Sequence, residues 1–588
     1  MNPREPLKRV LYIDLSKKSF WIDEREDLFE RWLGGVGVAV QLFKEEASKN
    51  VDPLSPENPV IFSVGPLTSL YPLASKTIAI FKSPLTGNLG ESHAGGRSAI
   101  ALRLAGYGAT VIKGASQLPV YLVIKEEEVE FRDASALWGV SNAITVGRIL
   151  RETAPGQGVR TIMRIGKAGE KLVSYAAVMT ETYRHFGRLG LGAVLGSKKV
   201  KGIIIYGKHT IPVEDKKKYR EVYDRLYKLS VESDAMKRYH DIGTAMNILP
   251  LNYIGALPTR NLNSSRFEGA EEISGENIAE KKLARRIACA HCPVACIHIA
   301  SIREPYPDEP YFYKTTFISY DHELIYSLGS MLGVKKIDNV LRLIDIVEAF
   351  GLDAISAGVS LAWATEAYKR GIVTINETLV ELDWGNVKNY IEAIKYIVEQ
   401  PNHFYTTLAK GTREASKHYG GQEFALNFGG NEMPGYHTGY GAIIGYSIGS
   451  RHSHLDCAGY RVDQTIKEPP SPEEYVEMLI KEEEWRQVLT SLVICLFART
   501  IYTVENVVDA LKPLGYDCTE DELKKLGEEI YLEKQKLKIE LGFNPRELKI
   551  PSRVFETSTP HGLLRRDYVE KALQHYAELI EYKINTSD

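Results

Sequence analysis

The sequence has few cysteines, no long apolar run and no excess of charge of either sign. Only six of its 588 residues are cysteine, and 73 Lys and Arg stand against 76 Asp and Glu. A secreted disulfide framework would use cysteine more densely in a shorter chain. The balanced charge provides no overall field for nucleic acid or an anionic membrane surface. No run approaches the roughly 18 apolar residues of a membrane-spanning helix.

The start of the chain and its composition indicate a cytoplasmic globular protein. The first residues, "MNPREPLKRVLYIDLS", run directly into a strand-like pattern, without the apolar core and cleavage site of a signal peptide. With 44% hydrophobic and 25% charged residues, the chain is long enough for three or four domains with large cores. We therefore expect no membrane span and no nucleic-acid partner.

The residue pattern changes character near residue 208. Before it, β-branched and aromatic runs alternate with Gly/Pro turns, which is typical of strands; the runs lie at 9–15, 18–24, 59–65, 77–82, 109–114, 120–125, 129–133, 160–166 and 202–207. After it, apolar residues recur at helical spacing over 217–240, 334–350, 386–400 and 566–584. The pattern predicts an α+β fold with a β-rich domain at 1–207 and two mostly helical domains at 208–410 and 411–588.

Three cysteines in the segment "CAHCPVACIH" form a C-x2-C-x3-C motif of Cys289, Cys292 and Cys296. Thiolates favour zinc or an iron–sulfur cluster among the common metals. Cys495, in the apolar segment "LTSLVICLFART", is a candidate fourth cluster ligand. A zinc site that uses these three cysteines with a nearby histidine, at position 291 or 298, is the competing interpretation. The spacing alone leaves both open.

Several longer motifs, spread along most of the chain, are similar to those of one known protein family. They are, in order, "LGGVGVAVQLF", "DPLSPENPVIFSVGPLT", "KSPLTG", "AGGRSAIALRLAGYGATVIKG", "GRLGLGAVLGSKKVKGI", "GTAMNI", "GALPTRNLN", "CAHCPVAC", "FGLDAIS" and "ICLF". In this order and spacing, from about residue 8 to 550, the chain resembles the tungsten-containing aldehyde ferredoxin oxidoreductases.

The resemblance implies a tungsten bis-pyranopterin (tungstopterin), a [4Fe-4S] cluster and a Mg²⁺ ion. The β-rich domain would form a base under the two pterins, and the helical domains would close over them. The cluster would be held by Cys289, Cys292, Cys296 and Cys495, and the Mg²⁺ by the main-chain carbonyls of His93 and His185. Further positions that match cofactor contacts are Lys76, Gly95, Arg184, Gly187, Arg188, Glu348, Asp353, Arg451 and Thr490. Four positions depart from the residues that are more usual in the family. Lys76 replaces an arginine, Glu348 an aspartate, Thr490 an acidic residue and Asp456 a lysine.

The resemblance also implies a catalytic set. Glu323, in "YDHELIYSLGSMLG", matches the general base, and a buried glutamate can have the raised pKa that a base needs. His454 matches the histidine that donates to the substrate oxygen, with His452 as the alternative. Tyr436, in "MPGYHTGY", matches a substrate contact.

The expected activity is oxidation of an aldehyde to a carboxylate, with water as the oxygen source. Electrons would pass through the cluster to ferredoxin or to a small polyferredoxin-like iron–sulfur subunit. Two alternatives remain. One is the catalytic subunit of a multi-subunit, tungsten-dependent reductase complex related to benzoyl-coenzyme A reductase. The other is a zinc-stabilised scaffold or binding protein that has lost the cofactor.

Overall fold

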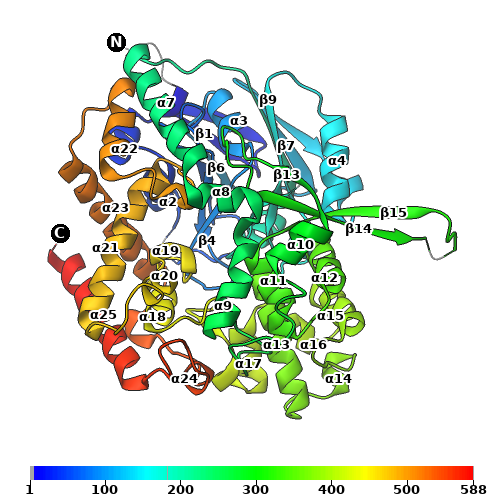
Figure 1. Cartoon of the computed structure of the whole chain (residues 1–588). Helices are drawn as coiled ribbons and strands as arrows, with labels where there is room; N and C mark the ends of the chain where they lie inside the picture. The colour runs from blue at the N-terminus through cyan, green and yellow to red at the C-terminus, as the bar shows by residue number, and fades with distance from the viewer. Residues whose placement is uncertain (1–5, 49, 182, 307, 587–588) are drawn as a thin grey trace.

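A computed structural model describes residues 6–48, 50–181, 183–306 and 308–586. Its N-terminal region is rich in strands and its later part is mostly helical, which confirms the predicted fold class. All nine segments predicted as strands contain one. Figure 1 shows α9 to α17 grouped below the sheets, and α21, α23 and α25 grouped on the left.

The first sheet has six strands in the order β2-β1-β6-β3-β4-β5. β1 pairs with β6 in parallel, and the other neighbours are antiparallel. Every residue of β4 is buried, and α2 (Gly35–Glu46) packs against β3 and β4. The strand bounds are Arg9–Asp14 (β1), Ser19–Glu24 (β2), Val60–Ser63 (β3), Thr77–Lys82 (β4), Leu89–Ala94 (β5) and Ala109–Lys113 (β6).

The second sheet also has six strands, in the order β11-β10-β9-β12-β7-β8. α3 (Ser98–Leu104) and α4 (Ala143–Thr153) pack against it, and β11 lies beside β5 of the first sheet. This contact brings the two predicted magnesium positions, on β5 and β11, to neighbouring strands. The bounds are Val120–Ile124 (β7), Val129–Asp133 (β8), Val159–Ile165 (β9), Val178–Thr180 (β10), Arg184–Phe186 (β11) and Val200–Gly207 (β12).

Helices dominate after residue 207. The helix predicted over 217–240 is two helices, α7 and α8, because Ser233 takes an extended backbone between them. The principal bounds to residue 419 are Lys216–Glu232 (α7), Asp234–Asp241 (α8), Ile248–Ile254 (α9), Gly275–Lys281 (α10), His322–Leu328 (α11), Ile337–Phe350 (α12), Ala354–Lys369 (α13), Val387–Glu399 (α15), His403–Leu408 (α16) and Thr412–Tyr419 (α17). Those beyond are Tyr440–Ile448 (α18), His454–Cys457 (α19), Gly459–Asp463 (α20), Pro472–Ser491 (α21), Val504–Leu511 (α22), Glu520–Glu540 (α23) and Arg566–Thr586 (α25).

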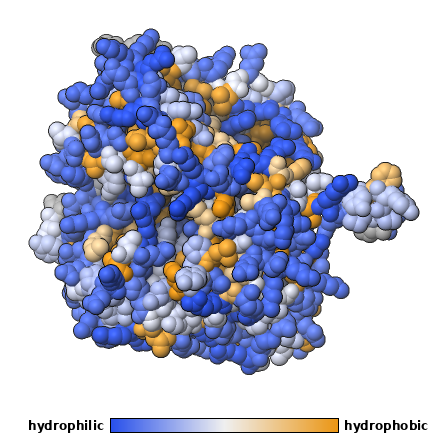
Figure 2. Space-filling view, viewed as in Figure 1, coloured by the Kyte–Doolittle hydropathy of each residue, from blue (hydrophilic) through white to orange (hydrophobic). Residues whose placement is uncertain are grey.

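A three-stranded antiparallel sheet within the helical part was not predicted from the sequence. It consists of β13 (Leu283–Ile287), β14 (Ile297–Pro305) and β15 (Tyr313–Tyr320). The hairpin of β14 and β15 stands clear of the rest of the surface (Figures 1 and 2), and Tyr311 near its tip is 92% exposed. Its strands carry charged residues among the apolar ones, so they lack the uninterrupted apolar runs of the N-terminal strands.

The large apolar core of the helical part also reaches into the N-terminal domain, and a smaller cluster joins the two regions directly. In that smaller cluster, Leu67 and Tyr71 pack with Leu489 and Ile494 from the end of α21 and beyond. Within the described part of the chain, every helix is too short or too polar to cross a membrane.

Candidate cofactor and active site

Four cysteines meet at one cavity. Cys289, Cys292 and Cys296 lie in the loop between β13 and β14, and Cys495 follows α21. All four line a cavity of about 30 Å³, which is larger than the ~10–15 Å³ that one buried water needs. None of them is in a disulfide. The cavity can therefore hold a group larger than a water molecule, with four sulfur ligands around it.

Backbone hydrogen bonds join these distant segments. The Cys495 amide donates to the Leu73 carbonyl at 2.9 Å, and the Ala290 amide donates to the Gly96 carbonyl at 2.9 Å. The first bond ties the segment after α21 to the N-terminal domain, and the second ties the cysteine loop to the segment after β5. The cavity is thus assembled from parts of the chain that lie about 200 residues or more apart.

Gly95 has little room beside the cavity, whereas Gly187 has open space. A Cβ atom at Gly95 would lie 2.7 Å from the Cys289 sulfur, which is too close for a contact between these atoms. It would also lie 3.4 Å from the Lys76 Nζ. A Cβ atom at Gly187 would meet nothing within 4 Å. Gly95 therefore allows the close approach of the backbone to a cysteine ligand, and Gly187 faces free space.

The chemistry of the cysteines fits a metal cluster. Burial raises the pKa of Cys296 to about 12 and also raises the pKa of Cys292. Without a metal these thiols stay protonated at neutral pH, and a bound metal would drive off the protons. The side chains of Lys76 and Arg184 also line the cavity and supply positive charge beside the sulfurs.

The histidines of the zinc alternative do not line this cavity. His291 is exposed. The ring nitrogens of His298 lie 2.9 Å from the His240 carbonyl and 3.2 Å from the Cys296 carbonyl. Among the described residues, no group of three or more His, Cys, Asp or Glu side chains is arranged to hold a single metal ion. A zinc site of three cysteines and one histidine would therefore have no histidine at this cavity.

Buried donors without partners lie on β11 and just after it, and one of them, Arg184, also lines the cysteine cavity. The Nε of Arg184, the Nε2 of His185 and an Nη1 of Arg188 are buried and have no hydrogen-bond partner in the described part of the chain. Leaving a buried donor unpaired costs free energy, and the cost is larger for a charged group. An anionic, phosphate-bearing cofactor would supply the acceptors that these donors lack. The donor set therefore fits a pterin phosphate or dithiolene.

Glu348 and Asp353, two carboxylates expected to contact the cofactor, are both buried. Asp353 caps α13 through the Ile355 amide at 3.0 Å and accepts from the Arg188 Nε at 3.1 Å. Glu348 accepts from the Ser319 hydroxyl at 2.8 Å, and burial raises its pKa to about 8. Asp353 thus holds Arg188 in place, whereas Glu348 has the pKa of a group that is mostly protonated at neutral pH.

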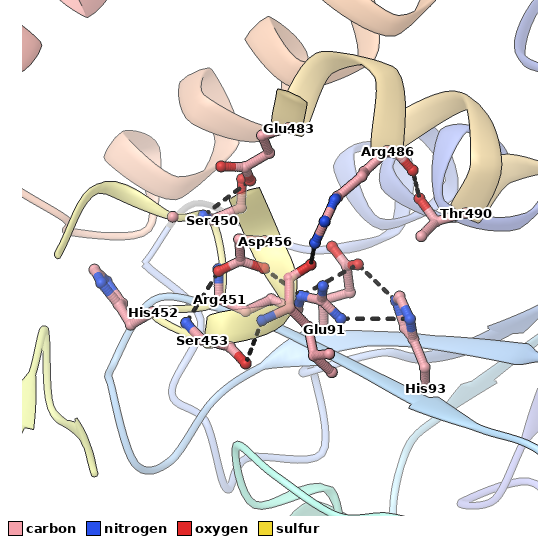
Figure 3. Close-up of polar contacts among 12 residues, drawn as sticks. Glu91, His93, Ser450, Arg451, His452, Ser453, Asp456, Glu483, Arg486 and Thr490 are labelled. Carbon is pink, nitrogen blue, oxygen red and sulfur yellow. Dashed lines mark hydrogen bonds and ion pairs between the residues drawn. The ribbon is translucent and has the colours of Figure 1, made fainter. Parts of the chain in front are cut away.

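A buried charge cluster surrounds His93 (Figure 3). Glu91 lies 2.6 Å from the His93 Nε2, 2.6 Å from the Lys534 Nζ and 3.8 Å from the Arg451 Nε. The Arg451 Nε also lies 2.6 Å from Asp456. Burial alone would raise the pKa of Glu91, but Lys534 and Arg451 hold that pKa well below its usual range. Asp456, at the position where a lysine is more usual, is therefore part of an ion-pair network that holds Arg451 in place.

Thr490 uses its hydroxyl within its own helix. The hydroxyl donates to the carbonyls of Arg486 and Gln487, at 2.8 and 3.2 Å. Its main-chain carbonyl lies near Gly35, where a Cβ atom would be only 2.2 Å away. Only the remaining acceptor capacity of the hydroxyl is left for a cofactor.

Glu323 lies in the first turn of α11, which Asp321 caps by accepting from the Leu324 amide. The Gly435 amide donates to the Glu323 Oε2 at 3.0 Å, and the Oε1 lies 3.4 Å from the His454 Nε2. Burial raises the pKa of Glu323 to about 8. Burial also holds the pKa of His454 well below its usual range, so its ring is neutral. The structure thus brings a buried acid and a neutral imidazole together.

Tyr436 belongs to an aromatic wall beside this pair. Its ring centroid is 5.3 Å from that of His454, 4.7 Å from that of His322 and 4.2 Å from that of Tyr460. His322 also contacts the Gly435 carbonyl through its Nε2 at 3.1 Å. The sequence interpretation missed His322 and Tyr460. His322 could have been suspected from the sequence because it precedes Glu323 at the start of a predicted helix. No sequence pattern pointed to Tyr460.

The structure separates the two candidate histidines. His454, at the start of α19, faces Glu323. His452 packs its ring against Phe543 at 5.5 Å and contacts the Tyr446 carbonyl at 3.1 Å, and it points away from the charge cluster in Figure 3.

Family models match nearly the whole chain. The model described as "Aldehyde ferredoxin oxidoreductase, N-terminal domain" matches residues 10–207, and that for domains 2 and 3 matches residues 221–586. The tungsten-containing aldehyde ferredoxin oxidoreductase of Thermococcus kodakarensis is 33% identical over an alignment of 578 residues that covers 94% of this chain and 92% of the relative. The WOR-like subunit of an aliphatic sulfonate oxidoreductase from Pyrococcus furiosus is 31% identical, over 69% of this chain and 66% of the relative.

A solved structure shares the fold. It is the active site complex BamBC of benzoyl coenzyme A reductase with 1,5-dienoyl-CoA, with a TM-score of 0.81 and 22% identity over 98% of this chain and 95% of that one. Together, the family models and the relatives confirm the family that the motifs indicated. The chain therefore belongs to the aldehyde ferredoxin oxidoreductase family and is an oxidoreductase.

Proposed function

We propose that the protein oxidises aldehydes to carboxylates, with water as the oxygen source. The observation that carries this proposal is the buried pair of Glu323 and His454, with the Glu323 Oε1 3.4 Å from the His454 Nε2. Oxidation of an aldehyde needs a group that takes a proton from water and a donor for the carbonyl oxygen. The proposed balance is RCHO + H₂O → RCOO⁻ + 3 H⁺ + 2 e⁻.

Members of this family bind a tungstopterin and an iron–sulfur cluster, and we propose a tungsten bis-pyranopterin, a [4Fe-4S] cluster and Mg²⁺ here. The four cavity cysteines would hold the cluster, and Lys76, Gly95, Arg184, Gly187 and Arg188 would contact the pterins. The main-chain carbonyls of His93 and His185 would hold the Mg²⁺, with Glu348, Asp353, Arg451 and Thr490 as further cofactor contacts. When bound, these groups would supply two-electron chemistry and a one-electron path outwards.

The chain's own groups divide the remaining work. The Glu323 Oε1 is the proton-accepting atom, and the Gly435 amide fixes the other oxygen of the carboxyl. The Nδ1 of His454 is buried and has no partner in the described structure, so it is free to bind the substrate oxygen. Tyr436 would form one wall of the aldehyde pocket. Burial of these groups keeps competing water from the reacting atoms.

The electron acceptor in this proposal is ferredoxin or a small polyferredoxin-like subunit. Two of the similar proteins are described as a subunit and as a complex, which supports a partner chain. A cytoplasmic location fits the proposal, because six free cysteines suit a reducing compartment. The alternative, a catalytic subunit of a multi-subunit reductase complex, would use the same cofactor sites in the direction of reduction.

Metal analysis and an aldehyde screen test the proposal. Protein purified anaerobically should contain about four iron atoms and one tungsten atom per chain, the set that the proposed cofactors require. It should also reduce methyl viologen with aldehydes, and the Glu323→Gln variant should not. Zinc alone, or loaded protein that oxidises no aldehyde of any size, would overturn the assignment. Reduction of an aromatic thioester only in the presence of a co-purifying subunit would favour the reductase alternative.

A further inference from the structure

An open groove of about 850 Å³ runs along the surface next to the cysteine loop. Its charged lining consists of Arg97, Arg151 and Arg160, with His209 and His291. Arg97 precedes α3, Arg151 lies in the last turn of α4, and Arg160 lies in β9. Figure 1 shows these three elements near each other in the upper part of the molecule. We call this feature the arginine groove.

The arginine groove is positively charged. Within the described part of the chain, no acidic residue lines it, and Arg97 and Arg151 are exposed and form no ion pair. Arg160 donates only to the carbonyls of Arg151 and Ala154, at 3.0 and 3.2 Å. Among the described residues, the guanidinium groups of Arg97 and Arg151 therefore face solvent without an ion-pair partner, whereas Arg160 is half-buried with its guanidinium group over the Tyr206 ring.

The end of the groove is the cluster-ligand loop. Its lining includes Ala290 and His291, which lie between the first two cysteines of the motif. The Ala290 amide donates to the Gly96 carbonyl at 2.9 Å, and Arg97 is the next residue. Gly95, two residues before Arg97, is in contact range of the Cys289 sulfur. The arginine groove is thus adjacent to the loop whose cysteines line the cavity.

We propose that the arginine groove docks a small, acidic iron–sulfur protein of the ferredoxin class, which accepts the electrons. This inference rests on the proposed function. Uncompensated positive charge selects an acidic partner and speeds its association, and contact with the cluster loop gives that partner a short path for electrons. Each aldehyde releases two electrons, so two one-electron acceptor clusters are reduced and no atom is transferred. A small phosphorylated ligand would satisfy the charge but would have no reason to lie at the cluster loop.

The test compares two acceptors on the loaded enzyme. In the double variant Arg97→Glu/Arg151→Glu, the rate with methyl viologen should be unchanged, because a small dye needs no docking surface. The KM for an acidic [4Fe-4S] ferredoxin should rise about tenfold, and its dependence on salt should flatten. The control is Arg566→Glu, at the start of α25, where the side chain is exposed and lines neither the arginine groove nor the pocket beside it. This control should keep the wild-type KM for ferredoxin.

Direct binding separates this proposal from the proposed function. Titration of the loaded enzyme with oxidised ferredoxin measures docking even if no aldehyde is oxidised, and the double variant should bind about tenfold more weakly. Equal affinity in the double variant and the Arg566→Glu control would overturn the docking site. Tight binding of ADP to the wild type, lost in the double variant while ferredoxin affinity stays the same, would overturn it too and indicate a nucleotide site.

Discussion

Replacement of Glu323 by glutamine should abolish aldehyde oxidation without loss of stability. The Glu323 side chain is 15% exposed, and burial of its carboxyl raises the pKa from 4.5 to about 8, a shift that corresponds to about 5 kcal/mol against the ionised form. At pH 7 only about a tenth of the carboxyl is ionised, whereas at pH 9 about nine-tenths is. A base that acts in its ionised form should therefore give a kcat/KM that rises about tenfold between pH 7 and pH 9.

The raised pKa of Glu323 also determines how its carboxyl affects the stability of the protein as pH changes. The folded state holds the proton more tightly than the unfolded state, so this group lowers the free energy of unfolding as pH rises from 4.5 to 8. A glutamine at position 323 cannot ionise, so the variant does not lose this stability as pH rises. Its side-chain oxygen can still accept from the Gly435 amide. We expect the Glu323→Gln variant to have a Tm at least equal to that of the wild type at pH 8, and kcat/KM to fall about 10²- to 10⁴-fold.

The assay is viologen-coupled aldehyde oxidation from pH 6 to pH 10, with thermal unfolding of each loaded variant. Glu484→Gln is the matched control, because burial also raises the pKa of Glu484, on α21, and none of the charged groups that act on it belongs to the proposed site. This control should keep the wild-type pH profile. A Glu323→Gln enzyme that retains the rising pH limb, or that loses its activity only because it unfolds, would refute the assignment of the base.

Three further substitutions have expected outcomes. Gly95→Ala should lower the iron content, since its Cβ would lie 2.7 Å from the Cys289 sulfur; iron per chain measures this, and full iron would contradict it. Cys495→Ser should remove a cluster ligand and weaken absorption near 400 nm, which an unchanged spectrum would disprove. Lys534→Met should lower the free energy of unfolding by about 3–5 kcal/mol at pH 7, because Glu91 loses a buried partner. Since the pKa of Glu91 is held well below 4.5, that difference should persist down to about pH 4.5 and disappear only as pH falls further, through the folded pKa; a denaturant series from pH 7 down to pH 2 checks it.

The sequence alone indicated nine strands of the N-terminal domain, the longer helices and four candidate cysteine ligands. The alternation of residues that face opposite sides of a strand, and the three-to-four spacing in α12, α15 and α25, are local signals. The sheet of β13 to β15 escaped prediction because its strands mix charged and apolar residues. Its pairing therefore depends on contacts between strands, which no local pattern encodes.

Only the tertiary structure decided which groups face each other. His452 and His454 are two residues apart, and the resemblance favoured His454 without excluding His452; in the structure only His454 faces Glu323, because the Ser453 cap starts α19 between them. The pKa of Glu323 follows from burial, which depends on the packing of segments more than 100 residues apart. The arginine groove likewise combines residues from three elements with the cysteine loop. Burial and long-range proximity are properties of the folded chain, so the sequence supplied the ligands and the folded structure supplied their environment.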